Sequence, residues 1–336
     1  MKKVIVTGGA GFIGSAFVRK LNREGINDIL IVDDLKDSVK WKNLRNLRFS
    51  DYINKNDFLE AVKTDKICYD PQAVVHMGAC SSTSETNADF LIENNYRFTR
   101  ILAEWAVEKN IRFLYAGSAA SYGNGKKGFS DETDLNLLSP LNIYGYSKHL
   151  FDLYAQQSGL LDRIVGLKYF NVFGPGEYHK GDMASMVFKA FHQVKEKGSV
   201  DLFKSYRDEY FDGEQMRDFV YVKDCVDVMW WLLMYSQVNG LFNLGTGRAR
   251  SWNDLVNAVF KAMGEDPVIK YIDMPMNIRD SYQYFTQAEM GRLKKTGCPL
   301  DFQLLEEAIR DYVVNHLQVD QSELNGSGNR KVRLVS

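Results

Sequence analysis

The sequence predicts an α/β protein in which a doubly wound parallel sheet is joined to a smaller second domain. In the first half, short apolar and β-branched runs alternate with longer stretches of helical periodicity. The apolar runs have few polar interruptions, which is typical of strands covered by helices on both faces. A glycine-rich turn follows the first run, as in the first strand–turn–helix unit of such sheets. Together these features indicate a parallel sheet.

The expected elements can be placed along the chain from these patterns. Strands of the main sheet are expected at residues 3–7, 28–32, 73–77, 112–118 and 163–170. Helices are expected at residues 12–24 and 90–110. Two later apolar runs are predicted to return to the same sheet, at residues 217–222 and 241–245. The remaining elements suit a smaller domain: a helix near 251–263, a strand at 268–274 and a last helix at about 303–317.

These elements divide the chain into two domains and a tail. The first domain is expected to comprise residues 1–171 together with about 217–246. The second is expected to comprise about 172–216 together with 247–318. Residues 319–336 are mostly polar and contain several Gly and Ser residues, so we expect this tail to be disordered.

The composition is that of an ordinary globular protein. The chain has 336 residues, 45% hydrophobic and 25% charged, and its net charge is −1, so nucleic acid is not expected as a partner. The most apolar late stretch, residues 228–235, is far shorter than the ~20 residues of a membrane span, and no membrane partner is expected. The four cysteines are widely spaced, so we expect reduced thiols in the cytoplasm and no metal site.

The stretch VTGGAGFIGS near the N-terminus has the spacing of a dinucleotide-binding loop. Gly9, Gly11 and Gly14 form G-x-G-x-x-G, while Gly8, Gly11 and Gly14 form G-x-x-G-x-x-G. Such a loop needs residues without Cβ so that the backbone can approach a pyrophosphate at the start of the next helix. Asp33 ends the following strand 19 residues after Gly14. A nicotinamide dinucleotide is therefore the predicted cofactor.

The residues near the expected ribose leave the choice between NAD and NADP open. Asp33 would hydrogen-bond the adenosine ribose, which favours NAD. Nearby lysines would accept a 2′-phosphate, which favours NADP, or would form an ordinary solvated loop. These lysines are Lys36, Lys40, Lys42 and Lys55.

The stretch YGYSK supplies a candidate acid/base pair. Tyr144 and Lys148 are spaced i, i+4 and so lie on one face of a helix. A free tyrosine titrates near pH ~10, and a neighbouring ammonium or a positive nicotinamide would favour its phenolate form. Ser118 ends a predicted strand, where ligands bind in open α/β sheets. These residues predict proton removal from a hydroxyl group while hydride leaves its carbon.

The motifs TGGAGFIG, HMGA, AGSAASYG and YxxxK occur in that order, and the set resembles the extended short-chain dehydrogenase/reductase family. Further stretches, from residue 1 to about 317, resemble its ADP-L-glycero-D-manno-heptose 6-epimerase branch; they include HMGACSST, NIYGYSKHLFD, KYFNVFGPGEYHKGDMAS and FNLGTGRARSW. The resemblance implies a Rossmann-like domain, a substrate-binding domain and inversion of C6″ of an ADP-heptose with tightly bound NADP. It also implies lipopolysaccharide inner-core synthesis in a Gram-negative cytoplasm, and a homo-oligomer with a pentamer as precedent.

The resemblance assigns roles to individual residues. Tyr144 and Lys180 become the two acid/base groups, supported by Lys148 and Ser118. The implied cofactor-binding residues are Gly8, Gly11, Phe12, Ile13, Gly14, Asp33, Asp34, Lys40, Lys55, Met77, Gly78, Ala79, Cys80, Ser81, Asn94, Lys148 and Val172. The implied contacts of the nucleotide sugar are Asn171, Asp182, Lys189, Leu202, Phe203, Lys204, Ser205, Arg217 and Tyr282.

The sequence departs from the pattern of this branch at four places. Gly117 replaces a second serine beside Ser118. Asp182 replaces a serine, and its carboxylate would repel a diphosphate unless it turned away. Residues 204–216 form a longer segment than the matching loop of the family. Asp34 adds a negative charge near the expected 2′-phosphate.

Other functions compete with this assignment. A 4-epimerase acting on a UDP-hexose would share the glycine loop and the YxxxK motif. Dehydratases of the superfamily carry an Asp-Glu pair where Ala119 and Ala120 stand, which disfavours elimination. A non-catalytic sensor or scaffold that binds the dinucleotide would have lost its catalytic residues, whereas Ser118, Tyr144 and Lys148 are all present.

Several of these residues also have ordinary structural interpretations. His76 is expected to be a hydrogen-bonded structural histidine rather than a base. Arg217 stands beside Asp218 and would form a surface salt bridge, or would clamp a phosphate, which we favour. Without the resemblance, Lys180 would be interpreted as a solvated loop lysine and Tyr282 as a packing residue.

Overall fold

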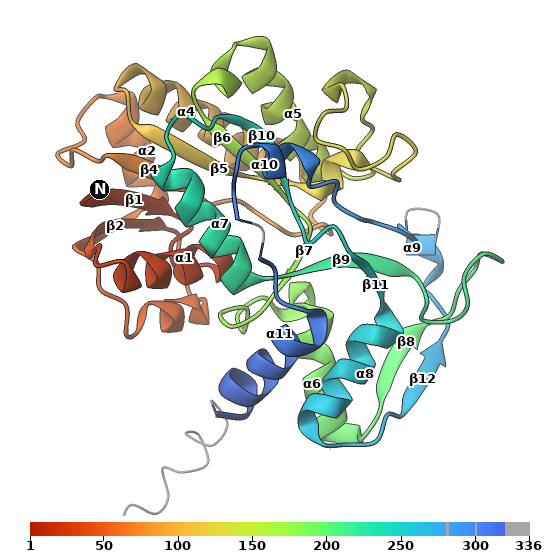
Figure 1. The fold of residues 1–336 in the computed structure, drawn as a ribbon. Helices are drawn as coiled ribbons and strands as arrows, with labels where there is room; N and C mark the ends of the chain where they lie inside the picture. The colour runs from red at the N-terminus through yellow and green to blue at the C-terminus, as the bar shows by residue number, and fades with distance from the viewer. Residues whose placement is uncertain (280–281, 300, 320–336) are drawn as a thin grey trace, which may run out of the picture.

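The computed structural model describes residues 1–279, 282–299 and 301–319 (Figure 1). Its largest sheet has seven parallel strands in the spatial order β10-β6-β5-β4-β1-β2-β3. These strands are β1 (Lys3–Thr7), β2 (Asp28–Asp33), β3 (Asp51–Asn54), β4 (Ala73–His76), β5 (Arg112–Ser118), β6 (Val165–Tyr169) and β10 (Gly240–Leu244). The predicted doubly wound parallel sheet is confirmed.

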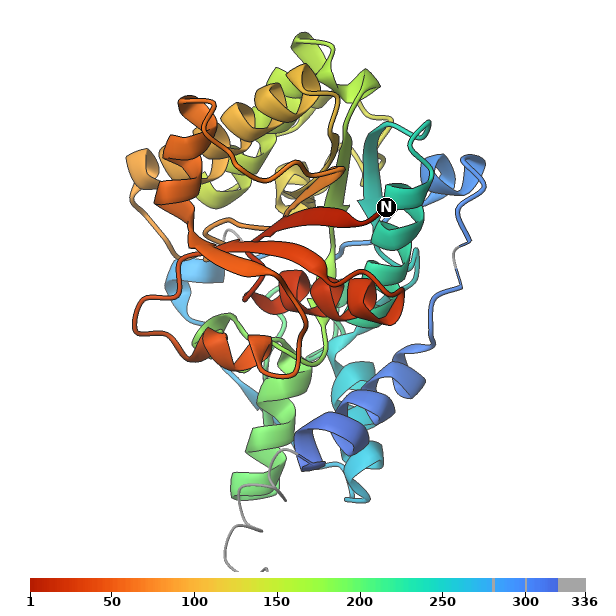
Figure 2. The ribbon, with the colours of Figure 1, turned by 90° about the vertical axis from the view of Figure 1, so that its left-hand side faces the viewer.

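Helices cover both faces of this sheet, as the uninterrupted apolar strands require. One face packs against α1 (Phe12–Arg23) and α7 (Val222–Met234), and the other against α2 (Lys55–Lys63), α4 (Phe98–Glu108) and α5 (Ile143–Gln157) (Figures 1 and 2). Alternate side chains of each strand enter the two cores. The sheet is therefore a buried central layer whose strand ends are the positions open to ligands.

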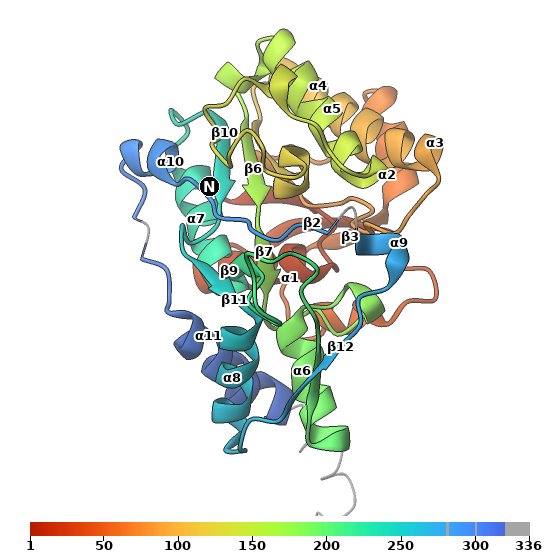
Figure 3. The ribbon, with the colours of Figure 1, turned by 90° about the vertical axis from the view of Figure 1, so that its right-hand side faces the viewer.

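The smaller part of the chain lies to one side of the central sheet (Figures 1 and 3). A three-stranded sheet combines β7 (Asn171–Phe173), β9 (Met216–Tyr221) and β11 (Ala249–Ser251), and a parallel pair combines β8 (Val200–Phe203) with β12 (Ile269–Ile272). A third apolar core joins β7, β8, β9 and β12 to α6 (Met186–Lys197), α8 (Trp252–Met263) and α11 (Leu305–Tyr312).

The remaining described elements are short. The other α-helices are α3 (Ala88–Leu91), α9 (Met276–Arg279) and α10 (Gly291–Lys295). Two π-helical turns span Ile92–Arg97 and Val313–Leu317. The 3₁₀ turns span Val39–Leu44, Ala119–Tyr122, Leu135–Leu137, Leu160–Asp162 and Gly181–Met183. Within the described ranges, every helix is too short or too polar to cross a membrane.

The expected return of residues 217–222 to the main sheet is wrong. These residues form most of β9, which pairs with β7 and β11 instead. The chain leaves the central sheet between Tyr169 and Asn171, and β9 follows β7 away from it. The edge of the main sheet is taken by β10, as expected for 241–245. The division into two domains stays a prediction, and residues 320–336 of the predicted disordered tail lie outside the described residues.

A fully buried ion pair joins β6 to α5. Lys168 Nζ lies 2.7 Å from Asp152 Oδ2, and both side chains are 0% exposed. Lys168 Nζ also donates to Ser121 Oγ at 2.5 Å, and the Tyr115 hydroxyl donates to Asp152 Oδ1 at 2.8 Å. Removing one partner of such a pair is costly because the other charge stays buried without compensation.

We therefore expect Asp152→Asn to lower the free energy of unfolding by about 3–5 kcal/mol, measured by urea denaturation. Asp65→Asn is the matched control, because it removes the same charge from the exposed Lys109–Asp65 pair. The control should unfold at the same urea concentration as the parent protein. Equal midpoints for all three proteins would show that the buried pair does not stabilise the junction of β6 and α5.

Candidate active site

The glycine loop joins β1 to α1, and its surroundings leave no room for a Cβ at Gly8 or Gly14. Gly8 has a φ of +65°, and a Cβ there would lie 2.6 Å from the backbone nitrogen of Gly78. A Cβ at Gly14 would lie 2.1 Å from the carbonyl oxygen of Gly8. Helix α1 begins at Phe12 after Gly11, and its first turn contains no acidic residue. This bare helix start fits the pyrophosphate of a dinucleotide.

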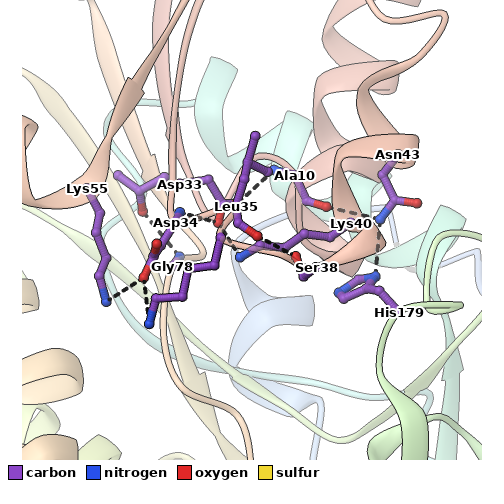
Figure 4. Close-up of polar contacts among 12 residues, drawn as sticks. Ala10, Asp33, Asp34, Leu35, Ser38, Lys40, Asn43, Lys55, Gly78 and His179 are labelled. Carbon is purple, nitrogen blue, oxygen red and sulfur yellow. Dashed lines mark hydrogen bonds and ion pairs between the residues drawn. The ribbon is translucent and has the colours of Figure 1, made fainter.

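Asp33, the last residue of β2, is held in place beside this loop (Figure 4). Its carboxylate is buried and accepts hydrogen bonds from the backbone nitrogen of Ala10 at 2.8 Å and from Lys40 Nζ at 2.6 Å. A carboxylate at this position fits the adenosine ribose of the dinucleotide. The ammonium group of Lys40 forms an ion pair with this carboxylate (Figure 4).

The negative charge of Asp34 is balanced by lysines within the site. Its Oδ2 lies 3.3 Å from Lys36 Nζ and 3.6 Å from Lys55 Nζ (Figure 4). Lys55 Nζ also donates to Asn94 Oδ1 at 2.7 Å. With Lys40 on Asp33, three ammonium groups therefore accompany two carboxylates at this end of the site.

His76 is a structural histidine, as expected. It ends β4, is 1% exposed, and its two ring nitrogens lie 2.6 Å from Thr7 Oγ1 and 2.8 Å from Thr99 Oγ1. Burial and the charge of Lys148 lower its pKa to about 3, so the ring is neutral near pH 7. It links β1, β4 and α4 beneath the cofactor loop.

The expected catalytic tyrosine and lysine lie on successive turns of α5, beside the end of β5. Lys148 Nζ donates to the carbonyl of Ala116 at 2.9 Å, and the Ser118 side chain lies near the Tyr144 hydroxyl. Burial lowers the pKa of Lys148 to about 8 and raises the pKa of Tyr144. The sequence predicted that neighbouring charges would favour the phenolate form of Tyr144. In the protein without its cofactor the opposite holds, because the desolvation of Tyr144 raises its pKa more than the nearby groups lower it.

Lys180 is half-buried rather than solvated. It lies in the segment between β7 and α6, and its Nζ is 5.4 Å from the ring centre of Phe12 in α1. Burial lowers the pKa of Lys180, and the nearby carboxylate of Glu177 opposes that shift. An amine with a lowered pKa gives up its proton more readily than an exposed lysine, which suits proton transfer.

One cavity of about 1000 Å³ brings these parts together. The predicted residues that line it are Gly8, Gly11, Phe12, Ile13, Gly14, Asp33, Lys40, Met77, Gly78, Ala79, Cys80, Ser81, Ser118, Tyr144, Lys148, Asn171, Val172, Lys180, Lys189, Leu202, Phe203 and Tyr282. The predicted residues outside its lining are Asp34, Lys55, Asn94, Asp182, Lys204, Ser205 and Arg217. The individual binding roles stay predictions.

Arg217 lies behind the cavity wall and forms no surface salt bridge with Asp218. It is 6% exposed, and its guanidinium carbon lies 5.1 Å from the ring centre of Tyr282 and 5.6 Å from that of Trp252. The Asp218 carboxylate instead accepts hydrogen bonds from Thr246 and from backbone amides. No carboxylate pairs with Arg217 in the described part of the chain, and its guanidinium donates instead to the carbonyls of Met216 and Gln283.

Asp182 and the charged side chains of residues 204–216, which depart from the family pattern, do not line the cavity. Asp182 is exposed, its carbonyl accepts a hydrogen bond from Lys189 Nζ at 2.6 Å, and it is not among the residues that line the cavity. In the longer 204–216 segment, Lys204 Nζ lies 3.2 Å from an exposed aspartate and Phe211 is 86% exposed. None of residues 204–216 lines the cavity, whereas Phe203, the last residue of β8, does.

A side chain at position 117 would lie close to the adjacent strand. A Cβ at Gly117 would lie 3.1 Å from the carbonyl oxygen of Leu167 on the adjacent strand β6. That distance is tighter than ordinary carbon–oxygen contacts, so a side chain there would require the strands to shift.

Sequence reasoning missed several residues of the site. His179 and Trp252 line the cavity, and Asn43 joins the glycine loop to the Lys180 segment. His179 could have been found by its position next to Lys180, whereas Asn43 follows no local pattern. Within the described ranges, no cluster of His, Cys, Asp or Glu side chains has the arrangement of a metal site.

Comparisons with known proteins agree with this architecture. Residues 4–245 match the NAD dependent epimerase/dehydratase family. An ADP-L-glycero-D-manno-heptose-6-epimerase from Nitratidesulfovibrio vulgaris is 57% identical over 314 residues, 93% of this chain and 97% of that protein. An enzyme of the same name from Fusobacterium nucleatum is 48% identical over 96% of this chain and all of its own length.

Solved structures give the same picture. The Helicobacter pylori ADP-L-glycero-D-manno-heptose-6-epimerase is similar with a TM-score of 0.76 and 29% identity, covering 94% of this chain and 96% of its own. A Thermotoga maritima UDP-glucose 4-epimerase has a TM-score of 0.74 and 26% identity, covering 95% and 99%. The sheet, the glycine loop, the Tyr144–Lys148 pair and these similarities together show that the chain belongs to the NAD-dependent epimerase/dehydratase family.

Proposed function

We propose that the protein is an isomerase that inverts C6″ of ADP-D-glycero-D-manno-heptose to give ADP-L-glycero-D-manno-heptose. The observation that carries this proposal is the meeting of Tyr144 and Lys180 in one cavity beside the dinucleotide loop. The names of relatives up to 57% identical over nearly the whole chain support the choice of heptose. The product would serve lipopolysaccharide inner-core synthesis.

Two residues of the chain handle the proton of the C6″ oxygen: one removes it, and the other supplies a proton afterwards. A nicotinamide dinucleotide, held by the glycine loop, supplies the reversible removal and return of hydride at the sugar carbon. One of Tyr144 and Lys180 takes the proton of the C6″ hydroxyl, and the other returns a proton after the keto sugar has presented its opposite face. The lowered pKa of Lys180 makes its neutral, proton-accepting form more accessible, and the raised pKa of Tyr144 keeps its hydroxyl in the protonated form from which a proton can be donated.

We propose NADP as the dinucleotide, with NAD as the alternative. The support is electrostatic, because Lys36, Lys40 and Lys55 surround the two carboxylates at the end of β2. These ammonium groups leave a net positive charge where the 2′-phosphate would lie. Asp34, whose charge disfavoured NADP in the sequence, is paired with two of them.

The cellular setting is part of the same proposal. A nucleotide-sugar substrate and cysteines that are all free suit the cytoplasm. A homo-oligomer, for which the family resemblance suggests a pentamer, stays a prediction.

The direct test is incubation of the purified protein with ADP-D-glycero-D-manno-heptose without added reductant, followed by NMR of the C6″ epimers. We expect the L-glycero epimer to appear with no net formation of reduced dinucleotide, and NADP to be the nucleotide released on denaturation. Tyr144→Phe should lower turnover by about 10²–10⁴-fold while the nucleotide stays bound.

A protein that holds its nucleotide but leaves this substrate unchanged would contradict the heptose assignment. Conversion of UDP-glucose to UDP-galactose by the same preparation would then support the 4-epimerase alternative. Retention of full turnover by Tyr144→Phe would instead remove Tyr144 from the mechanism.

The burial of Lys148 predicts a pH-dependent cost in stability. Its pKa falls from 10.5 to about 8, so the folded protein carries the full penalty of a buried ammonium below pH 8 and loses it as pH rises towards 10.5. We expect Lys148→Met to raise the free energy of unfolding at pH 7 by on the order of 3 kcal/mol, with the gain vanishing near pH 10.5. Lys127→Met, at an exposed position, should leave the free energy of unfolding unchanged at both pH 7 and pH 10.5. Urea denaturation across pH 6–10.5 measures this, and a pH-independent difference would refute it.

A further inference from the structure

The segment that carries Lys180 is closed into a single unit by one buried carboxylate. Glu177 is 0% exposed and accepts hydrogen bonds from the backbone nitrogen of Gly174 at 3.3 Å, from Ser185 Oγ at 2.7 Å and from the Ser185 backbone nitrogen. Ser185 is also the N-cap of α6. The backbone nitrogen of Lys180 donates to the Glu177 carbonyl at 2.9 Å. Both ends of residues 174–185 and Lys180 within them are therefore tied to Glu177.

Asn43 ties this unit to the glycine loop (Figure 4). Its Nδ2 donates to the carbonyl of Ala10 at 3.0 Å and to the carbonyl of Gly176 at 2.9 Å, and lies 3.3 Å from His179 Nδ1. Burial lowers the pKa of His179, whose ring lies against the same amide. One amide therefore contacts the dinucleotide loop and two residues of the Lys180 segment, one of them adjacent to Lys180.

The short helix that carries Asn43 also reaches the expected ribose site. Asn43 belongs to the 3₁₀ turn Val39–Leu44, and Lys40 in the same turn pairs with Asp33. Ala10 connects the two residues through its backbone, because its nitrogen donates to Asp33 and its carbonyl accepts from Asn43. A ligand that binds at Asp33, Lys40 and the glycine loop therefore acts on the residues that hold Asn43.

We propose that Asn43 is a positioning residue that couples the dinucleotide site to the Lys180 segment, so that dinucleotide binding orders the segment carrying the second acid/base group. The inference rests on the proposed function for the role of Lys180, but the coupling itself concerns only the dinucleotide and the protein. An amide is required because two carbonyls must be satisfied by N–H donors, which an aspartate of the same shape lacks. Asn43→Asp would place an acceptor against both carbonyls.

The test is hydrogen–deuterium exchange of residues 174–185, measured by mass spectrometry while NADP is titrated into the nucleotide-free full chain. In the parent protein we expect exchange in this segment to slow as NADP saturates the site. In Asn43→Asp the slowing should be lost although NADP still binds, and turnover of the NADP-loaded enzyme should fall on the order of 10²-fold with little change in KM. Asn46→Asp introduces the same charge three residues away at an exposed side chain and should match the parent protein.

Two results would overturn the proposal. The first is that NADP binds to the parent protein without slowing exchange in residues 174–185, a result that needs no variant. The second is Asn43→Asp in which the slowing persists at NADP saturation. If Asn43→Asp does not fold, Asn43→Ala takes its place in both the exchange and the turnover measurements, because it removes the N–H donors without adding charge. Slowed exchange in a protein that fails to epimerise the heptose would preserve the coupling and reject the proposed function alone.

Discussion

The steric closeness of the glycine loop to its neighbours is the constraint on which the rest of the site depends. Because Gly8 and Gly14 leave no room for Cβ atoms, β1, β4 and α1 approach one another at a fixed distance. That approach sets the position of Ala10, whose backbone contacts both Asp33 and Asn43, and of Phe12, whose ring faces Lys180. One loop thus orients the ribose end, the pyrophosphate site and the second acid/base group.

Burial is the second theme, because it changes the proton affinity of each group in the proposed chemistry. Desolvation lowers the pKa of Lys148 and Lys180 and raises that of Tyr144. The two lysine shifts cost stability at neutral pH, where the raised pKa of Tyr144 does not. The same layer of the fold contains the compensated Lys168–Asp152 pair. The chain therefore keeps some buried charges paired with an opposite charge, and leaves others unpaired where a ligand or a proton transfer can use them.

The parts of the fold that depend on local pattern could be predicted from the sequence. Buried parallel strands, the glycine loop and the i, i+4 pair Tyr144–Lys148 each follow from spacing within a few residues. What could not be predicted depends on distant contacts. The pairing of β9 with β7 rather than the main sheet, and the bridge from Asn43 to Gly176, join residues far apart in sequence. The raised pKa of Tyr144 likewise depends on how deeply the folded chain buries it, which no motif states.

The central claim is that one hydrogen leaves C6″ and returns to the same carbon. It is tested most directly by giving the enzyme ADP-D-glycero-D-manno-heptose carrying deuterium at C6″, in ordinary water and with unlabelled dinucleotide. Transient oxidation and re-reduction predict that the L-glycero product keeps its deuterium at C6″, because the hydride never exchanges with solvent. Product that has lost the deuterium to water would contradict this mechanism and would indicate removal of that hydrogen as a proton.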